Sequence, residues 1–373
     1  MAYTDTIKVI LISQIPLPYN QIGSWSTLYS NYFVDNHKVD IIICEKPLYY
    51  FAQIKYGIVR RDFIDKIKKN FFKINKAEYQ RELEKTIKDD GRFVIQIIDN
   101  YGMVKPIHDL LQKMGLRKNC FLQFFFHGFY PYTQQNSSQK FYNLLDEIIV
   151  LTDSSYKAFK EEVPVLPNFF SILHNGINTV KFNKIGSSEK MALRQGLGFS
   201  TKRVFIWCSQ DRPKKGLHII LDAWQKIAQN HDDVVLLIIG CEPKKDTETV
   251  KYLGRIPNDE LSKFYQIADC YLFPTLWQEG FGLSLIEALH CGCYCIASKL
   301  GGVPEVLQWG KYGKLIDNPH FVEEWVDAIT EFLEGKLTYP SLPKELYSTE
   351  AWNVGMNNII EEAKRRLDNR TAP

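Results

Sequence analysis

Two glutamates that lie eight positions apart, Glu279 and Glu287, are the residues of this chain best suited to chemistry. They bound the sequence Glu-Gly-Phe-Gly-Leu-Ser-Leu-Ile-Glu, in which Gly282 marks the expected start of a helix that runs to His290. A helix N-terminus offers unpaired backbone N–H groups and the positive end of the helix dipole, and both favour phosphate. Carboxylates beside such a terminus suit the hydroxyl groups of a ribose or a hexose. The segment therefore indicates a phosphate-linked sugar as its ligand.

The spacing of the two glutamates argues against a hydrolase. Eight residues of helix rise about 12 Å, whereas the two carboxyl groups of a glycosidase lie roughly 5–9.5 Å apart. We therefore expect the two side chains to hold different parts of one ligand, with Glu287 more than two turns along the helix.

Three other segments place polar residues directly after an expected strand or in the loop that follows it. Lys215 lies in the turn 209–216, where a cation can neutralise a diphosphate leaving group without a metal ion. His127 follows the apolar run 120–126 and can hydrogen-bond a sugar hydroxyl or the reacting centre. Gly23 ends a proline-rich loop and lets a phosphate or an acceptor approach the backbone closely. For each of them a purely structural role is the alternative.

The elements that must position these residues alternate along the chain. Short apolar runs such as 7–13 and 93–98 are typical of buried strands, and helical stretches separate them. The second half repeats the scheme, with strands expected at 204–208 and 234–239. Strands that alternate with helices predict parallel sheets joined by right-handed crossovers. We expect an α/β protein with two Rossmann-like domains, whose ligands bind in a cleft beyond the C-terminal ends of the strands.

The length of 373 residues agrees with two domains. We expect the first domain to span residues 1–182 and the second to span residues 183–349. A final helix at 350–369 carries an apolar face, for which the first domain is the candidate partner.

Composition and cysteine usage indicate a cytoplasmic protein. Hydrophobic residues make up 45% and charged residues 24% of the chain, which is ordinary for a soluble protein. We find no signal peptide and no apolar run long enough for a membrane span. The eight cysteines suggest no disulfide framework. Three of them lie in the segment 291–295, which lacks accompanying metal ligands, so we expect packing rather than a metal site.

A basic segment leaves two interpretations open. Residues 55–88 contain 11 Lys or Arg and 5 Asp or Glu, a net charge of +6, and Ile64, Ile67 and Phe71 recur at helical spacing. The pattern predicts an amphipathic helix. Its basic face is either simply solvated or touches anionic lipid or an acidic acceptor, with 60–88 as the contact region. We find no nucleic-acid-binding module.

The segment 279–288 resembles the Glu-x7-Glu motif of retaining glycosyltransferases of family 4, which have the GT-B fold. Five more segments are similar to the family's sequences in the same order: Leu173-His-Asn-Gly-Ile-Asn178, Lys215-Gly216, Tyr252-Leu-Gly-Arg-Ile256, Pro274-Thr275 and Gly301-Gly-Val-Pro-Glu305. The first half resembles the family only through Gly23 and His127, as expected for an acceptor-binding domain.

The resemblance implies a role for each matching residue. Glu287 would bind the ribose hydroxyls of the nucleotide, Glu279 the hydroxyls of the donor sugar, and Lys215 the diphosphate. His127 would contact the donor sugar. The remaining implied donor contacts are backbone groups of Phe281, Gly282 and Leu283, Ser284 near the phosphates, the Arg255-Ile256 backbone near the base, and Gly23. The family needs no essential metal or other cofactor and retains the anomeric configuration.

One position departs from the family pattern. The family usually carries Gly-Arg five residues before the lysine, where this chain has Ser209 and Gln210. Arg212 is a candidate replacement for the missing cation, and a neutral partner at Gln210 is the alternative.

The sequence therefore predicts transfer of a hexosyl unit from a nucleotide-diphosphate sugar, with a UDP-sugar favoured over GDP-mannose, to a glycolipid or oligosaccharide acceptor. Two other classes remain open. One is a non-catalytic sugar-nucleotide-binding protein that assists a partner enzyme. The other is a nucleotide-sugar epimerase or a sugar phosphorylase on the same fold. A dinucleotide dehydrogenase is disfavoured, because no Gly-x-Gly-x-x-Gly follows either opening strand.

Overall fold

The structure is a computed structural model that describes residues 6–19, 24–34, 37–60, 77–87, 91–131, 137–200 and 202–371. The chain forms two units. The first contains residues 1–174 and 349–373, and the second contains residues 175–348. The expected boundary after residue 182 is therefore wrong by one short segment, because residues 175–182 lie in the second unit. In the described ranges, none of the helices is both long enough and apolar enough to cross a bilayer.

The first unit is built on a parallel sheet, in which the described residues form seven strands in the order β3-β2-β1-β4-β5-β6-β7. The strands are β1 (Lys8–Ile12), β2 (Ile41–Cys44), β3 (Lys55–Ile58), β4 (Phe93–Ile98), β5 (Cys120–Phe125), β6 (Glu147–Val150) and β7 (Phe169–Ile172). The described helices are α1 (Ser24–Tyr32), α3 (Ala77–Thr86), α4 (Tyr101–Lys113), α5 (Ser137–Tyr142), α6 (Asp153–Glu162) and α13 (Thr349–Thr371). The strand order reverses between β1 and β4, as in Rossmann-like sheets.

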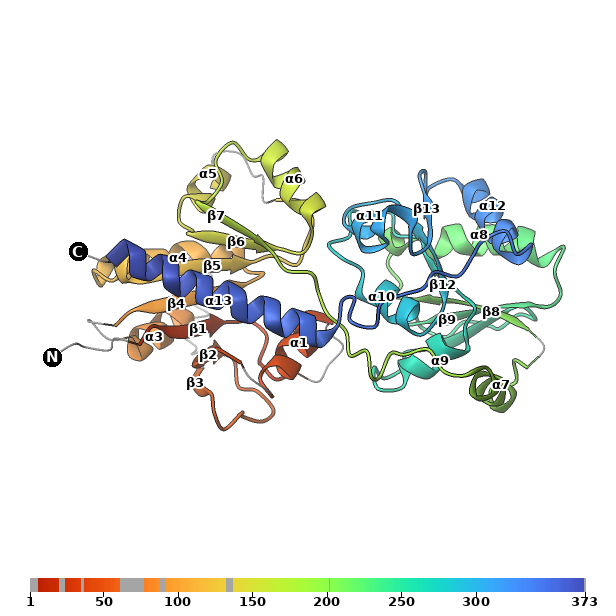
Figure 1. The fold of residues 1–373 in the computed structure, drawn as a ribbon, viewed down its shortest axis with the longest axis horizontal. Helices are drawn as coiled ribbons and strands as arrows, with labels where there is room; N and C mark the ends of the chain where they lie inside the picture. Colours follow the sequence, from red (N-terminus) through yellow and green to blue (C-terminus); the bar gives the residue numbers. More distant parts are fainter. Residues whose placement is uncertain are drawn as a thin grey trace. The chain divides into compact units, whose positions relative to one another are not determined.

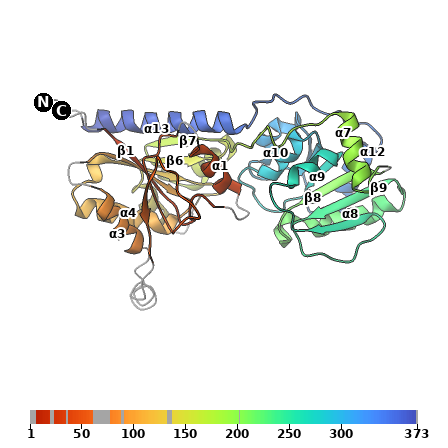
Figure 2. The ribbon, with the colours of Figure 1, turned by 90° about the horizontal axis from the view of Figure 1, so that it is seen from below.

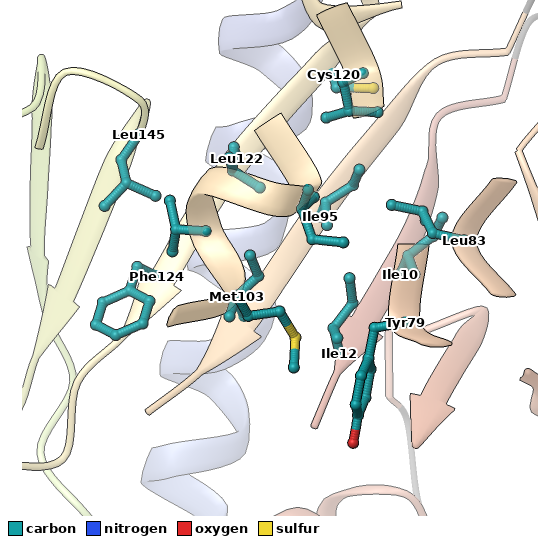
Figure 3. Packing of buried hydrophobic residues seen from close by; sticks show 14 of the residues in the cluster. Ile10, Ile12, Tyr79, Leu83, Ile95, Met103, Cys120, Leu122, Phe124 and Leu145 are labelled. Atoms are coloured by element: carbon teal, nitrogen blue, oxygen red, sulfur yellow. The ribbon is translucent and has the colours of Figure 1, made fainter. Parts of the chain in front are cut away.

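Alternate residues of each strand in the first unit pack on opposite faces of the sheet. Ile10 and Ile12 of β1 belong to the core under α3, α4 and α5, whereas Val9 and Leu11 belong to the core under α1 and α13. Figure 3 shows Ile10, Ile12 and other side chains of the first core, and Figures 1 and 2 show α13 along the opposite face from α3 and α4. This period of two follows from strand geometry, and it explains why the central strands are mostly apolar on both faces.

The last helix packs on the first unit. The apolar face of α13 enters the same core as α1, through the buried residues Trp352, Met356, Ile359, Ile360, Ala363 and Leu367. An ion pair also links α13 to the sheet of the first unit. Arg366 Nη1 lies 3.2 Å from Oε1 of Glu147, a side chain in β6 that is only 1% exposed. Glu147 also accepts hydrogen bonds from Gln123 at 2.7 Å and Ser171 at 2.6 Å.

The second unit repeats the scheme with a parallel sheet in the order β10-β9-β8-β11-β12-β13, counted over the described residues. The strands are β8 (Arg203–Cys208), β9 (Val234–Ile239), β10 (Val250–Gly254), β11 (Cys270–Phe273), β12 (Tyr294–Ser298) and β13 (Lys314–Ile316). The helices are α7 (Ser187–Gly196), α8 (Leu217–Ala228), α9 (Leu261–Ile267), α10 (Leu283–His290), α11 (Val303–Val306) and α12 (Val322–Leu333). Helices α8 and α12 contact one another and share one core with the sheet, whereas α10 packs against β11, β12 and α9.

The predicted elements differ from the observed ones mainly at the edges of the sheets. Strands β3, β7 and β10 and helix α7 were not predicted, and α7 lies where we expected the connection between the domains. The residues of the predicted basic helix, including Ile64, Ile67 and Phe71, lie outside the described ranges. Helix α3, which follows that segment, carries Tyr79 and Leu83 into the core of the first unit.

Candidate active site

Lys215, Glu279 and the start of α10 lie beyond the two strands where the order of the second sheet reverses. Strands β8 and β11 are neighbours in that sheet, although they are not consecutive along the chain. The loop 209–216 follows β8 and the loop 274–282 follows β11. Ligands of parallel α/β sheets bind at such a reversal, beyond the carboxyl ends of the strands.

Lys215 and Glu279 meet across this point. The Lys215 Nζ atom donates a hydrogen bond to Oε2 of Glu279 at 2.6 Å, and the two side chains are 21% and 25% exposed. This cation and this carboxylate are both partly exposed, so they can separate and each bind a different group of one ligand. The cation suits a diphosphate, and the carboxylate accepts hydrogen bonds from hydroxyl groups.

A close backbone contact fixes the turn that carries Lys215. Gly216 has a positive φ of 69°, and a Cβ atom at this position would lie 1.9 Å from the carbonyl oxygen of Pro274. The backbone N–H of Leu276 donates to the Lys214 carbonyl at 2.8 Å. Only glycine allows the two loops to approach this closely, and for this reason the Lys-Gly pair is a recognisable sequence signal.

A second glycine turn supports Glu279. Gly301 has a φ of 64°, and its missing Cβ would lie 2.5 Å from the backbone nitrogen and 2.4 Å from the carbonyl oxygen of Glu279. The N–H of Gly302 donates to that oxygen at 2.8 Å. The Gly-Gly-Val-Pro-Glu segment therefore holds the backbone of the Glu279 loop in place.

Helix α10 begins at Leu283, one residue later than predicted, after Gly282 in the left-handed conformation with φ 89° and ψ 65°. Glu279 consequently lies in the loop, and Glu287 lies little more than one turn into the helix. Our assumption of eight helical residues between the two glutamates is therefore wrong. The N–H groups of Leu285 and Ile286 donate to the Gly282 carbonyl at 3.1 and 3.4 Å, whereas those of Leu283 and Ser284 have no acceptor among the described contacts and are available to an anion. Phe281 is 2% exposed.

Glu287 is half-buried, and its carboxyl group has no hydrogen-bond or ion-pair partner among the described residues. Burial raises the pKa of this carboxyl to about 8, against a smaller opposing effect of the Lys181 ammonium. A carboxyl group that is kept from water but not paired within the protein is typical of a functional position.

Sequence reasoning missed Lys181. The Asn178 side chain accepts hydrogen bonds from the N–H groups of Val180 and Lys181, at 3.0 and 2.9 Å, and so closes a turn. The Lys181 Nζ atom donates to the carbonyl of Asn258 at 2.5 Å. The Asn-Gly-Ile-Asn segment thus holds a cation near Glu287, and Asn178 was the available signal.

Four other predicted residues lie at the surface or near it. Gln210 and Arg212 are exposed, so whether Arg212 replaces the missing family cation stays a prediction. Arg255 is exposed, with its guanidinium 3.5 Å from Glu242, and Ile256 is half-buried.

His127 belongs to the first unit, where it lies just beyond β5. Its backbone N–H donates to Oδ1 of Asp99 at 2.7 Å, and its Nδ1 lies 3.0 Å from Oδ2 of the same carboxyl. The ring stacks on Trp25, with centroids 5.4 Å apart and planes 17° apart. Because a carboxylate only accepts hydrogen bonds, Nδ1 carries the proton and Nε2 stays available for another partner.

Asp99 is a second residue that sequence reasoning missed. It directly follows β4, as His127 follows the neighbouring β5. Its backbone has a φ of 49°, which is uncommon for a residue other than glycine. An aspartate directly after a buried strand was the available signal. Gly23 lies outside the described ranges, so its predicted contact is not addressed by the structure.

The cysteines of the segment 291–295 pack as small apolar residues. The Cys293 thiol donates to the carbonyl of Tyr265 at 3.1 Å, and burial raises the pKa of Cys293 to about 12. Among the described residues, no group of three or more His, Cys, Asp or Glu could hold a metal ion. That the chemistry needs no metal stays a prediction.

The second unit also contains a cavity of about 490 Å³. Phe182, Lys184, His290, Tyr339 and Lys344 are among the residues that line it. No predicted site residue contributes to its walls, so this cavity is separate from the candidate active site.

Comparison with known sequences finds one family model that matches most of the second unit. Residues 189–348 match the model described as glycosyl transferases group 1. The chain is 22% identical over 236 residues to spore coat protein SA of Bacillus subtilis, covering 58% of this chain and 63% of that protein. It is 30% identical over 150 residues to phosphatidyl-myo-inositol mannosyltransferase of Mycobacterium leprae, covering 38% of each. The match thus spans less than two thirds of either relative.

Comparison with solved structures extends the likeness over both units. The structure of Alr3699/HepE from Anabaena in complex with UDP superposes with a TM-score of 0.71, at 18% identity, over 96% of this chain and 100% of that chain. The same protein in complex with UDP-glucose gives a TM-score of 0.67. The two parallel sheets have the GT-B fold. The matched family model and the mannosyltransferase of Mycobacterium leprae are both described as glycosyltransferases, and this chain is similar to them.

Proposed function

We propose that this chain is a retaining glycosyltransferase that moves a hexosyl unit from a nucleotide-diphosphate sugar to a glycolipid or oligosaccharide acceptor. The observation that carries the proposal is the Lys215–Glu279 contact at the reversal of the second sheet, beside the N-terminus of α10. A cation, a carboxylate and free backbone N–H groups at one place suit the diphosphate and the sugar of such a donor.

Each site residue has a separate task in this proposal. The Lys215 ammonium and the start of α10 stabilise the charge that develops on the diphosphate as it departs. Glu279 accepts hydrogen bonds from the donor sugar, and Glu287 accepts them from the ribose. Positioning and electrostatics supply the rest of the catalytic gain, without a metal ion. The role of His127 toward the donor sugar is part of the proposal, and it rests on the resemblance of this residue to the family.

A UDP-sugar is the favoured donor, and the first unit is the favoured acceptor-binding part. The Anabaena protein whose structures contain UDP and UDP-glucose matches over 96% of this chain, whereas the mannosyltransferase of Mycobacterium leprae matches over 38%. Phosphatidyl-myo-inositol in the name of that relative supports a lipid-linked acceptor.

The proposal includes a contact between the basic segment 60–88 and an anionic membrane surface. Leu48, Tyr49 and Tyr50, in the described loop before β3, are 69%, 52% and 50% exposed. Aromatic residues are common at the membrane interface, and lysines favour anionic lipid. Reversing Lys66, Lys68 and Lys69 to Glu should abolish co-sedimentation with phosphatidylglycerol vesicles. Unchanged co-sedimentation would contradict the contact.

The proposed function is tested by nucleotide binding followed by turnover. UDP at 100 times its dissociation constant should stabilise the wild type by about 2.7 kcal/mol. Glu287→Gln should lose this shift, whereas Glu323→Gln, an exposed position in α12, should keep it. Transfer from UDP-hexose to an acceptor should then be detectable. Binding without turnover over a broad acceptor panel would favour a non-catalytic partner protein, and conversion of the donor without acceptor would favour an epimerase.

A further inference from the structure

The Tyr271 side chain contacts both segments that carry the candidate donor site, the end of β8 and the start of α10. Its ring is fully buried in β11. Its hydroxyl lies 2.9 Å from Oγ of Ser284, in the first turn of α10, and 3.2 Å from the carbonyl oxygen of Cys208, the last residue of β8. The turn that carries Lys215 begins directly after Cys208. One phenol group therefore contacts both the helix start and the strand that leads to the cationic turn.

The phenol has one proton for two acceptors. Burial raises the pKa of Tyr271 well above its usual value, so the hydroxyl stays protonated at neutral pH. In one arrangement it donates to the Cys208 carbonyl, and the Ser284 hydroxyl donates inward to the phenol oxygen. In the other, it donates to Ser284 Oγ, and the serine proton is free to point outward.

An anion bound at the start of α10 would favour the second of these two arrangements over the first. The inward arrangement presents the lone pairs of Ser284 to the anion, which is unfavourable. The outward arrangement presents a donor whose oxygen is itself hydrogen-bonded, and hydrogen bonds in such a chain strengthen one another. No proton changes its covalent partner, because both hydroxyl groups only rotate.

We propose that Tyr271 is a positioning residue for diphosphate binding, which acts by directing the proton of Ser284 toward the phosphate. The inference rests on the proposed function, because it assigns the anion to the diphosphate of a nucleotide sugar. Neither Tyr271 nor this role was predicted from the sequence.

Tyr265 provides a matched comparison for the experiment. It is as fully buried as Tyr271 and contacts it edge to face, with ring centroids 5.7 Å apart and planes 88° apart. Among the described contacts, none joins Tyr265 to Ser284. A general loosening of the core would follow from either Tyr→Phe substitution, whereas an effect through Ser284 would follow from only one of them.

The test is a double-mutant cycle, which separates a coupled pair from two independent effects. The dissociation constants of UDP, GDP and ADP are measured by calorimetry for the wild type, and the tightest ligand is then used for Tyr271→Phe, Ser284→Ala and the double variant. We expect about a tenfold loss for Ser284→Ala, the equivalent of one hydrogen bond to a charged group. We expect about a fivefold loss for Tyr271→Phe.

The decisive comparison is made in the Ser284→Ala background. There Tyr271→Phe should cause no further loss, because the group through which it acts is gone, and Tyr265→Phe should have no effect in either background. An equal loss with and without Ser284, or no loss at all, would overturn the inference while the wild type still binds nucleotide. A wild type that binds none of the three nucleotides would instead overturn the proposed function, and the inference with it.

Discussion

The first six strands of each unit follow the same order in their sheet, but the two units fix their candidate functional residues by different means. In the second unit, Gly216 and Gly301 bring one backbone within contact of another and so hold Lys215 and Glu279. In the first unit, the Asp99 side chain fixes His127 by contacts to its backbone N–H and to its ring. A close backbone contact allows only glycine at a position. A side-chain contact requires only that the two residue types fit one another. The same strand order is therefore accompanied by a strong sequence motif in the second unit and by a weak one in the first.

The first prediction concerns the ion pair that ties α13 to the first unit. Arg366→Met should destabilise this unit by about 3–5 kcal/mol, because it leaves the carboxylate of Glu147 buried without its cation. Arg365→Met is the matched control, since this neighbour pairs with Glu362 at the surface and is 66% exposed. Nucleotide binding by the second unit should be unchanged. Urea unfolding and calorimetry measure the two properties, and equal stability of the two variants would contradict the assignment.

A backbone change in the second unit should have a slightly smaller effect on stability but a direct effect on the site. Gly216→Ala should cost about 3 kcal/mol, because its Cβ would overlap the Pro274 carbonyl. It should also weaken nucleotide binding, since Lys215 would move. Gly115→Ala is the control in the first unit, where φ is 73° and nothing lies within 4 Å of the added carbon. Thermal unfolding that is equally lowered in both variants would show that the close approach is not what matters at Gly216.

The raised pKa of Glu287 predicts a pH dependence of stability. The folded state keeps a proton that an unfolded glutamate loses near pH 4.5, so its contribution is fully present below pH 4.5 and is lost as the pH rises to about 8. A tenfold change in proton affinity corresponds to about 1.4 kcal/mol, and we expect a total effect of about 2 kcal/mol after solvent screening. Glu287→Gln should flatten this slope in urea unfolding between pH 5 and 8. A slope equal to that of the wild type would contradict the assignment.

The smallest expected effect concerns the contact between Asp99 and His127 in the first unit. Asp99→Asn should lower kcat/KM about tenfold, which is about 1.4 kcal/mol, because an amide holds the His127 ring less well than a carboxylate. The affinity for nucleotide should stay the same, because Asp99 and His127 belong to the first unit. Steady-state kinetics and calorimetry measure the two properties, and an unchanged kcat/KM would contradict the role of Asp99.

The sequence predicted the fold and the second unit's site more fully than the first unit's. Strands such as β2 and β9 are buried along their whole length and give unbroken apolar runs, whereas the missed β3, β7 and β10 lie at sheet edges and alternate poorly. Asp99, Lys181 and Tyr271 were missed for another reason. Each acts on a residue distant in the sequence, so no local spacing marks the pair. The start of α10 was misplaced because Gly282 lies in the left-handed conformation outside the helix.

The most direct test of the account compares two adjacent lysines. Lys215 contacts Glu279 at the candidate donor site, whereas the Lys214 side chain is exposed. We predict that Lys215→Met weakens the binding of a nucleoside diphosphate at least about tenfold, as measured by calorimetry with UDP and then GDP and ADP. Lys214→Met should bind as the wild type does. Equal affinities of the two variants, or a wild type that binds none of these nucleotides, would contradict the assignment of the donor site to this edge of the second sheet.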